Sequence, residues 1–298
     1  MKVLITGGTG FIGSALCNEL MKDKNNEITI LSRNADITST QLKIINNLNE
    51  IKNDASFDII INLAGEPIAD KKWSKEQKQK IITSRIETTE EIIEFIKNSV
   101  IKPKLLISGS AIGYYGIHKS DAEHDENSAS DDSFSSKLCQ QWEATALQAN
   151  DYGVRTCLLR TGIVLGKNSG ALGKMLMPFK MGLGGKIGSG EQWMSWIHIS
   201  DLVGIILHCI EHDSIEGPVN GTAPNPSTNN EFTKALGKAL KRPTFIPMPK
   251  IVINILMGQM GVELLLSGKK ILPIKALENS YQFKYPTLDS ALNNVIQA

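Results

Sequence analysis

The stretch Thr6-Gly7-Gly8-Thr9-Gly10-Phe11-Ile12-Gly13 decides the fold of this 298-residue chain. It follows a short apolar run and precedes a helical pattern that ends near Met21. The glycines at positions 7, 10 and 13 suit a tight turn, a close approach of backbone to pyrophosphate, and close packing of helix against strand. The start of a helix also offers free N–H groups and a partial positive charge to phosphates. The context of strand, turn and helix therefore favours a dinucleotide site over a glycine-rich turn without a ligand. Its expected contacts are Gly7, Thr9, Gly10, Phe11, Ile12 and Gly13.

Short apolar runs alternate with helical patterns through the first two-thirds of the chain. This alternation predicts an α/β fold with a doubly wound parallel sheet of the Rossmann type. The expected strands are rich in leucine and β-branched residues, as strands buried on both faces are. They are Val3–Thr6, Ile28–Leu31, Asp58–Leu63, Leu105–Ser108 and Val154–Arg160. For residues 42–45 the sequence does not decide between a short edge strand and a loop.

Two helices are expected between these strands. Ser74 followed by Gln77 predicts a capping box at the start of the first helix. A second helix is expected from about 135 to 149. The buried face of the first helix is predicted at helical spacing, as Ile82, Ile86, Thr89, Ile93 and Ile96.

The chain is expected to have three parts: a dinucleotide-binding domain over 1–165, substrate-side loops and helices over 166–245, interleaved with that domain, and a C-terminal helical segment over 246–298. Seven glycines between 170 and 190 predict a long mobile connection, the usual place for a substrate loop. The acidic stretch 118–133 is expected to be a solvated loop. The apolar run Ile251–Leu266 is interrupted by polar residues and too short to cross a bilayer, so a core helix is expected there.

The composition is ordinary for a globular protein of enzyme size. A net charge of +1 gives no electrostatic reason to expect nucleic acid or an anionic membrane as a partner. The four cysteines have no metal-binding or disulfide spacing, which predicts buried thiols in a reducing compartment and no metal site. A strand-like run from Lys2 leaves no room for a signal peptide, so a cytoplasmic location is expected. The oligomeric state stays open.

The end of the second strand decides which dinucleotide is expected. An NAD site usually places Asp or Glu about 20 residues beyond the glycine motif, on the ribose 2′-hydroxyl. Here Ser32 and Arg33 stand at that place. A hydroxyl and a guanidinium suit a 2′-phosphate, which arginine holds in a bidentate way, so NADP is favoured. Asp36 would favour NAD if the strand ended later.

Several longer motifs resemble a known superfamily. TGGTGFIG at 6–13, NLAG at 62–65 and SGSAIGYYG at 108–116 resemble the extended short-chain dehydrogenase/reductases, which include nucleotide-sugar epimerases and dehydratases. More narrowly, four further stretches are similar to the YfcH-type epimerase family proteins, and the similarity runs nearly end to end. They are LAGEPIADKKW at 63–73, SRIETT at 84–89, KLCQQWE at 137–143 and LLLSGKKILP at 264–273.

This resemblance implies further cofactor contacts. Ser32 and Arg33 would hold the adenosine phosphate, and Ile163 would meet the nicotinamide carboxamide. Arg85 looks like an additional contact, although from the residue pattern alone a solvated helix face is the simpler interpretation. The adenine-ribose side of the cleft would be lined by Leu63, Ala64 and Gly65.

The resemblance also implies a catalytic set with one member missing. The superfamily uses a serine, a tyrosine as acid and base, and a lysine four residues after it, because a tyrosine of pKa about 10 needs a nearby cation to act at neutral pH. Ser110 and Lys137 match the serine and the lysine, but Ser133 stands where the tyrosine would be. Tyr115, or its neighbour Tyr114, is the candidate replacement, and a structural aromatic pair is the alternative.

Two functions follow from this pattern. The first is an NADP-dependent oxidoreductase or epimerase acting on an unidentified small molecule, such as a nucleotide sugar. The second is an NADPH-binding regulator that acts through a protein partner. His198 and Asp201 resemble a catalytic pair, but Asp201 directly precedes an apolar helix and is predicted to be its N-cap.

Overall fold

The computed structural model describes residues 1–32, 42–51, 56–119, 121–167 and 170–297. Its centre is a parallel sheet of seven strands in the order β11-β7-β5-β4-β1-β2-β3. The expected Rossmann-type sheet is confirmed, and residues 42–45 form the edge strand that the sequence left open. The strands are β1 Lys2–Thr6, β2 Glu27–Leu31, β3 Leu42–Ile45, β4 Ile59–Asn62, β5 Leu105–Ala111, β7 Arg155–Thr161 and β11 Gly217–Gly221. The sequence did not predict β11, because its Gly217-Pro218 start lacks an apolar run.

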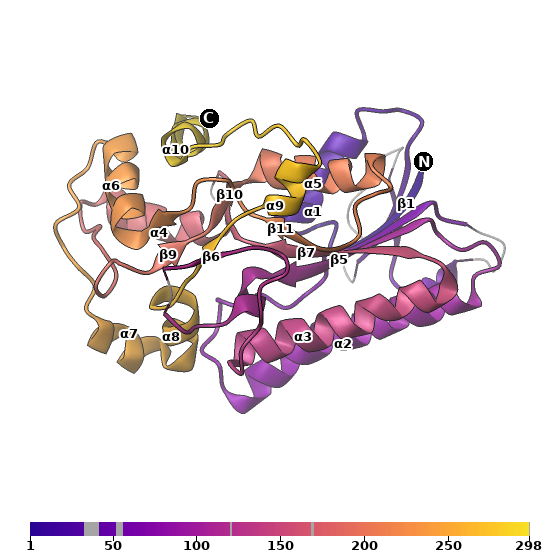
Figure 1. Cartoon of the computed structure of the whole chain (residues 1–298), viewed down its shortest axis with the longest axis horizontal. Coiled ribbons are helices and arrows are strands. Elements are labelled where there is room, and N and C mark those ends of the chain that lie inside the picture. The colour runs from indigo at the N-terminus through magenta and orange to yellow at the C-terminus, as the bar shows by residue number, and fades with distance from the viewer. Residues whose placement is uncertain (33–41, 52–55, 120, 168–169, 298) are drawn as a thin grey trace.

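Helices cover both faces of this sheet. Figure 1 shows α2 (Lys75–Asn98) and α3 (Phe134–Leu147) on one face, and α1 (Phe11–Leu20) and α5 (Ile199–Glu211) on the other. Side chains of a strand point alternately to the two faces. Accordingly Leu4 packs in the α2 and α3 layer, and its neighbours in β1 pack in the α1 and α5 layer. The sheet is therefore buried on both sides.

The first long helix differs in detail from its prediction. The Ser74 hydroxyl caps α2 by accepting a hydrogen bond from the Gln77 backbone N–H at 3.1 Å. The Gln77 side chain turns to Glu66 at 3.4 Å, so only half of the expected capping box forms. Ile82 is half-buried, whereas its neighbour Ile81 is fully buried. Ile81 belongs to a buried cluster with Trp73 and with Met260 of the C-terminal segment, and Ile82 packs at the edge of that cluster.

Two predicted loops are more ordered than expected. The glycine-rich connection contains α4 (Gly170–Lys180), because Leu172, Leu176 and Phe179 pack at helical spacing and outweigh the glycines. In the acidic stretch, Glu126 is buried and accepts hydrogen bonds from backbone N–H groups far along the chain, so that stretch is not wholly solvated. The short strands are β6 Glu123–His124, β8 Ile163–Leu165, β9 Trp193–Met194, β10 Trp196–His198 and β12 Ser227–Thr228, and the 3-10 helices are Leu48–Glu50, Ile112–Tyr115 and Gln148–Tyr152.

The C-terminal segment does not contain the expected core helix over 251–266. Gly258, with a φ of 57°, separates two helices at this place. In the first of them only Ile253 is buried, so most of its apolar side chains face outward. The described part of the chain has no helix that is long and apolar enough to span a bilayer. The remaining elements are α6 Asn229–Leu240, α7 Lys250–Met257, α8 Gln259–Leu265, β13 Lys270–Ile271, α9 Ile274–Glu278 and α10 Leu288–Gln297.

The predicted N-cap of α5 is also wrong. His198 is the N-cap, and its ring nitrogen Nδ1 accepts a hydrogen bond from the Ser200 N–H at 3.1 Å. Asp201 lies in the first turn, where its carboxylate accepts hydrogen bonds from the backbone of Lys284 at 2.7 Å and of Tyr285 at 2.9 Å. The carboxylate therefore anchors the chain's last segment to the sheet layer. This partner lies more than 80 residues away, which is why local pattern could not reveal it.

Candidate dinucleotide site

The glycine turn lies at the carboxyl end of β1 and has the geometry that phosphate binding needs. Gly7 has a φ of 68°, and a Cβ there would lie 2.7 Å from the Leu63 carbonyl carbon. A Cβ at Gly13 would collide with the Gly7 carbonyl oxygen. Gly10 differs, because a Cβ there would approach only that same oxygen, at 3.2 Å. Packing therefore requires glycine at positions 7 and 13, whereas a side chain at position 10 would meet only one backbone oxygen, in a tight contact.

The turn lies at the switch point of the sheet, between the carboxyl ends of β1 and β4, whose connections α1 and α2 leave to opposite faces (Figure 1). In sheets of this type the crevice that takes a ligand lies at that point. The Thr6 hydroxyl donates to Asn62 Oδ1 at 2.6 Å and accepts from the Ala64 N–H at 3.2 Å. Asn62 in turn donates to the Thr89 hydroxyl at 2.9 Å. These bonds fix residues 63–65 beside the glycine turn, as expected for one continuous site.

Arg85 points inward from α2. A Cβ on Gly65 would lie 3.0 Å from the Arg85 guanidinium carbon, so the two residues are in contact. The guanidinium lies 5.2 Å from the Trp142 ring centre and donates to the Ile81 carbonyl at 3.1 Å. Burial lowers the pKa of Arg85. The solvated helix face that its residue pattern alone favoured is therefore wrong.

The other predicted cofactor contacts surround the same edge of the sheet. Ser32 directly follows β2, where its N–H donates to the Ile45 carbonyl at 3.0 Å. Ile163 starts β8 and donates from its N–H to the Ser195 carbonyl at 2.9 Å. The Phe11 ring packs so closely against Gly166 that a side chain there would collide with it. Arg33 and Asp36, which would decide between NADP and NAD, lie outside the described residues.

Ser110 belongs to a buried network that the sequence reasoning missed. Its hydroxyl donates to Glu143 Oε1 at 2.6 Å, and Arg160 donates to both oxygens of that carboxylate at 2.8 Å. The side chains of the ion pair are only 4% and 7% exposed. The signal in the sequence was a charged residue inside an otherwise apolar strand, which needs a buried partner.

Tyr115 is the far end of this network. Its hydroxyl donates to Asn220 Oδ1 at 2.6 Å and accepts from Arg160 at 3.0 Å. The side chain is fully buried, and burial raises its pKa to about 12 despite the nearby guanidinium. The hydroxyl is buried and both of its hydrogen-bonding partners belong to the protein, so this geometry disfavours Tyr115 as acid and base. Tyr114 is half-buried, and its ring covers the Arg160 guanidinium at 3.4 Å.

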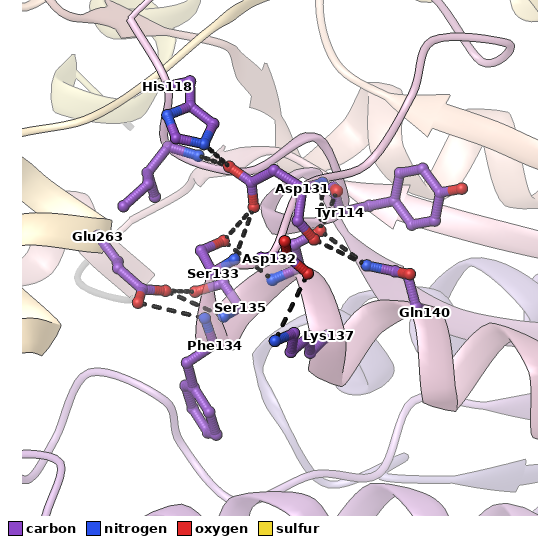
Figure 2. Close-up of polar contacts among 12 residues, drawn as sticks. Tyr114, His118, Asp131, Asp132, Ser133, Phe134, Ser135, Lys137, Gln140 and Glu263 are labelled. Atoms are coloured by element: carbon purple, nitrogen blue, oxygen red, sulfur yellow. Dashed lines mark hydrogen bonds and ion pairs between the residues drawn. The ribbon is translucent and has the colours of Figure 1, made fainter.

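Ser133, at the position of the missing tyrosine, is the N-cap of α3. Its hydroxyl donates to Asp131 Oδ1 at 2.6 Å and is near the Ser136 N–H at 3.4 Å (Figure 2). Lys137 lies one turn further, 65% exposed, with Nζ 3.5 Å from Asp132. Ser110 and Lys137 thus point to different carboxylates, and no hydrogen bond joins them in the described part of the chain.

A carboxylate from the C-terminal segment also closes the start of α3. Glu263 of α8 accepts hydrogen bonds from the Ser135 N–H at 2.9 Å, the Ser135 hydroxyl at 2.6 Å and the Phe134 N–H at 3.3 Å (Figure 2). Beside it, the Phe134 and Trp73 rings meet edge to face at 4.8 Å. The C-terminal segment therefore covers the helix end that in the superfamily carries the catalytic tyrosine and lysine.

The sheet, the switch-point crevice and the glycine turn together define a dinucleotide-binding α/β protein of the Rossmann class. The sequence profile of the NAD dependent epimerase/dehydratase family matches residues 3–220, and that of a domain of unknown function, DUF1731, matches residues 248–295. The chain therefore belongs to the NAD dependent epimerase/dehydratase family, which confirms the resemblance drawn from its motifs.

Individual relatives match over nearly the whole chain. The chain is 40% identical over 307 residues to the chloroplastic epimerase family protein SDR39U1 homolog of Arabidopsis thaliana, covering 100% of this chain and 87% of that protein. It is 39% identical to human epimerase family protein SDR39U1, covering 99% and 100%. The crystal structure of human SDR39U1 isoform 2 with NADPH matches with a TM-score of 0.90 and 37% identity, covering 100% of this chain and 99% of that one. A UDP-glucuronic acid 4-epimerase from Bacillus cereus in complex with NAD has a TM-score of 0.79 at 18% identity, covering 100% and 96%, and shares the fold.

Proposed function

We propose that this protein binds NADPH in the crevice between the ends of β1 and β4. The observation that carries the proposal is the glycine turn at the switch point of the sheet, which brings the start of α1, without a side-chain cap, to the carboxyl end of β1. The human relative crystallised with NADPH supports the same choice of cofactor. The glycine turn would hold the pyrophosphate, and Ser32 and Arg33 would hold the 2′-phosphate.

The remaining contacts follow from the residues around the crevice. Leu63, Ala64 and Gly65 would line its adenine-ribose side. Arg85, inward-facing and in contact with Gly65, would reach the cofactor from α2. Ile163, at the start of β8, would meet the nicotinamide end.

On this basis the protein is an NADP-dependent oxidoreductase or epimerase of a small molecule, with nucleotide sugars as the first class to test. In a reduction NADPH would supply a hydride and the protein a proton, whereas in an epimerisation NADP⁺ would take up a hydride and return it to the other face while the protein removes and returns a proton. Lys137, exposed at the start of α3, can hold ribose hydroxyls and carry a proton. Tyr114 is the phenol that remains, since Tyr115 is occupied within the buried network.

The hydrogen bonds at the start of α3 favour a second function. Ser133 is turned to Asp131, and Glu263 covers the first N–H groups of the helix, so the usual proton relay has no phenol there. A regulator that binds NADPH and signals to a protein partner needs no such relay. The two functions share the cofactor site and differ in turnover.

Calorimetry on the full chain tests the cofactor site. The Gly10→Asp variant places a carboxylate at the start of α1, where it would repel the pyrophosphate, so NADPH binding is expected to fall below detection. Asn18→Asp adds the same charge on an exposed position of α1 and should bind as the unchanged protein does. Unaltered NADPH affinity in Gly10→Asp would show that the crevice is not the site.

Turnover separates the two functions. Slow oxidation of NADPH over a panel of aldehydes and ketones would support the oxidoreductase, and interconversion of nucleotide-sugar epimers by the NADP⁺-loaded protein, with no net change in the cofactor, would support the epimerase. Tight NADPH binding without turnover of any member would favour the regulator. Each candidate reaction must vanish in Gly10→Asp and persist in Asn18→Asp to be attributed to this site.

A further inference from the structure

One end of the molecule exposes large apolar side chains from three separate segments. They come from the end of α4 and the loop after it, from the loop before α7, and from α7 itself. Figure 1 shows α7 and the loop leading into it at the end of the molecule far from the N-terminus. We call this surface the α7 end, and its main members are Met181, Leu183, Phe245, Ile251, Ile255 and Leu256.

The three segments form one continuous surface. The Ile246 N–H donates to the Gly184 carbonyl at 3.3 Å, and the Met248 N–H donates to the Lys186 carbonyl at 2.9 Å. These bonds place the two loops side by side, and α7 follows directly. On α7 the exposed residues recur four apart, at 251 and 255 and at 252 and 256, while Ile253 faces the interior. Exposed apolar surface of this extent on a folded protein marks an interaction site.

Basic residues predominate in the segments that form this surface. Residues 170–190 and 232–262 contain eight lysines and arginines and no aspartate or glutamate, although Glu191 and Glu231 adjoin these ranges. Lys174 and Lys238 form ion pairs with aspartates outside these ranges. Of the others, Lys180, Lys186 and Lys250 are exposed beside the apolar residues. Glu263, the next carboxylate along the chain, is buried against α3. The net charge of +1 thus conceals an uneven distribution.

We propose that the α7 end docks on a lipid surface with anionic headgroups. An apolar helix face with lysines beside it and no carboxylates is the composition that binds such a surface, where basic groups meet the headgroups and apolar side chains enter the boundary. A second copy of the chain fits less well, because symmetric pairing would bring like charges together. Phe245 is 86% exposed, so nearly the whole ring stands clear of the protein, which suits a fluid interface better than a fitted protein pocket.

Co-sedimentation of the full chain with vesicles tests this proposal. Vesicles of phosphatidylcholine alone are compared with vesicles that also contain phosphatidylglycerol. We expect binding to the second kind only, weakening as salt rises above about 0.1 M, because screening shortens the range of the attraction. Phe245→Asp and Ile251→Asp should each weaken that binding at least about tenfold. Lys180→Glu with Lys250→Glu should have a similar effect.

Matched controls come from the opposite part of the molecule. Val100 and Ile101 are 80% and 62% exposed in the loop before β5, so Val100→Asp and Ile101→Asp change the same chemistry elsewhere. They should bind vesicles as the unchanged protein does, and all variants should keep the same NADPH affinity. Absence of binding to anionic vesicles, or equal binding by the Phe245→Asp and Val100→Asp variants, would overturn the proposal. So would a concentration-dependent dimer that Phe245→Asp abolishes, because the occupant would then be a second copy.

Discussion

Replacing Glu263 with glutamine should show how strongly the C-terminal segment holds the start of α3. The carboxylate is 8% exposed and accepts four hydrogen bonds, two of them from the first N–H groups of the helix and one from the Gln259 side chain. Glutamine keeps the shape but loses the charge. Hydrogen bonds to charged groups contribute about 1.5–3 kcal/mol and neutral ones about 0.5–1.5 kcal/mol. A charge at a helix N-terminus adds about 0.3–1 kcal/mol. Because bonds within one network are not additive, we expect Glu263→Gln to cost about 1–2 kcal/mol.

Urea unfolding followed by circular dichroism measures this cost. Glu278→Gln is the matched control, because Glu278 is exposed on α9, and it should change the unfolding free energy by less than about 0.5 kcal/mol. Hydrogen exchange should also speed up at the amides of residues 134 and 135, because they bond to different carboxylate oxygens and glutamine keeps only one, neutral, acceptor oxygen. A double-mutant cycle with Ser135→Ala should give a coupling of about 1 kcal/mol or more. An unfolding free energy for Glu263→Gln equal to that of the control would refute the contact.

Three other predictions follow from the site and its surroundings. Arg33→Ala should weaken NADPH binding about tenfold to a hundredfold and leave NADH binding unchanged, since a charge-assisted bond to phosphate contributes about 1.5–3 kcal/mol. If calorimetry shows that the affinities for both cofactors fall equally, Arg33 has a structural role instead. Tyr115→Phe should lower the unfolding free energy by about 1–3 kcal/mol without removing turnover. Tyr114→Phe should reduce any turnover about 10²–10⁴-fold if the Tyr114 phenol is the acid. Steady-state rates corrected for the folded fraction measure both effects, and an unchanged rate in Tyr114→Phe would exclude Tyr114 as the acid. Burial lowers the pKa of His198, so the unfolded chain binds a proton at a higher pH than the folded protein does. The unfolding free energy should therefore fall as the pH drops below about 6.5. Urea unfolding between neutral and mildly acidic pH should show a shallower fall in His198→Asn.

The sequence by itself determined most of the sheet and the cofactor turn. Gly13 is needed because a Cβ there would collide with the Gly7 carbonyl oxygen within the same strand-turn-helix unit, and Gly7 because the turn there has a φ of 68°. The β-branched runs predicted five of the seven strands; the structure adds β3, where the sequence left a choice, and β11, which the sequence did not predict. The cap at Ser74 likewise depends on a residue three positions away. Features of this kind are local, so a reader of the sequence can recover them.

Tertiary structure decided what the remaining side chains do. Tyr115 looked like an available phenol until β11 brought Asn220 to it from 105 residues away. Ser135 meets Glu263 across 128 residues, which no spacing rule could reveal. In α7 both sides of the helix are apolar, so periodicity could not tell which side would be covered. The physical reason is the same in each case: local pattern records which side chains are apolar or charged, whereas the path of the chain decides which partners reach them and which are left to the solvent.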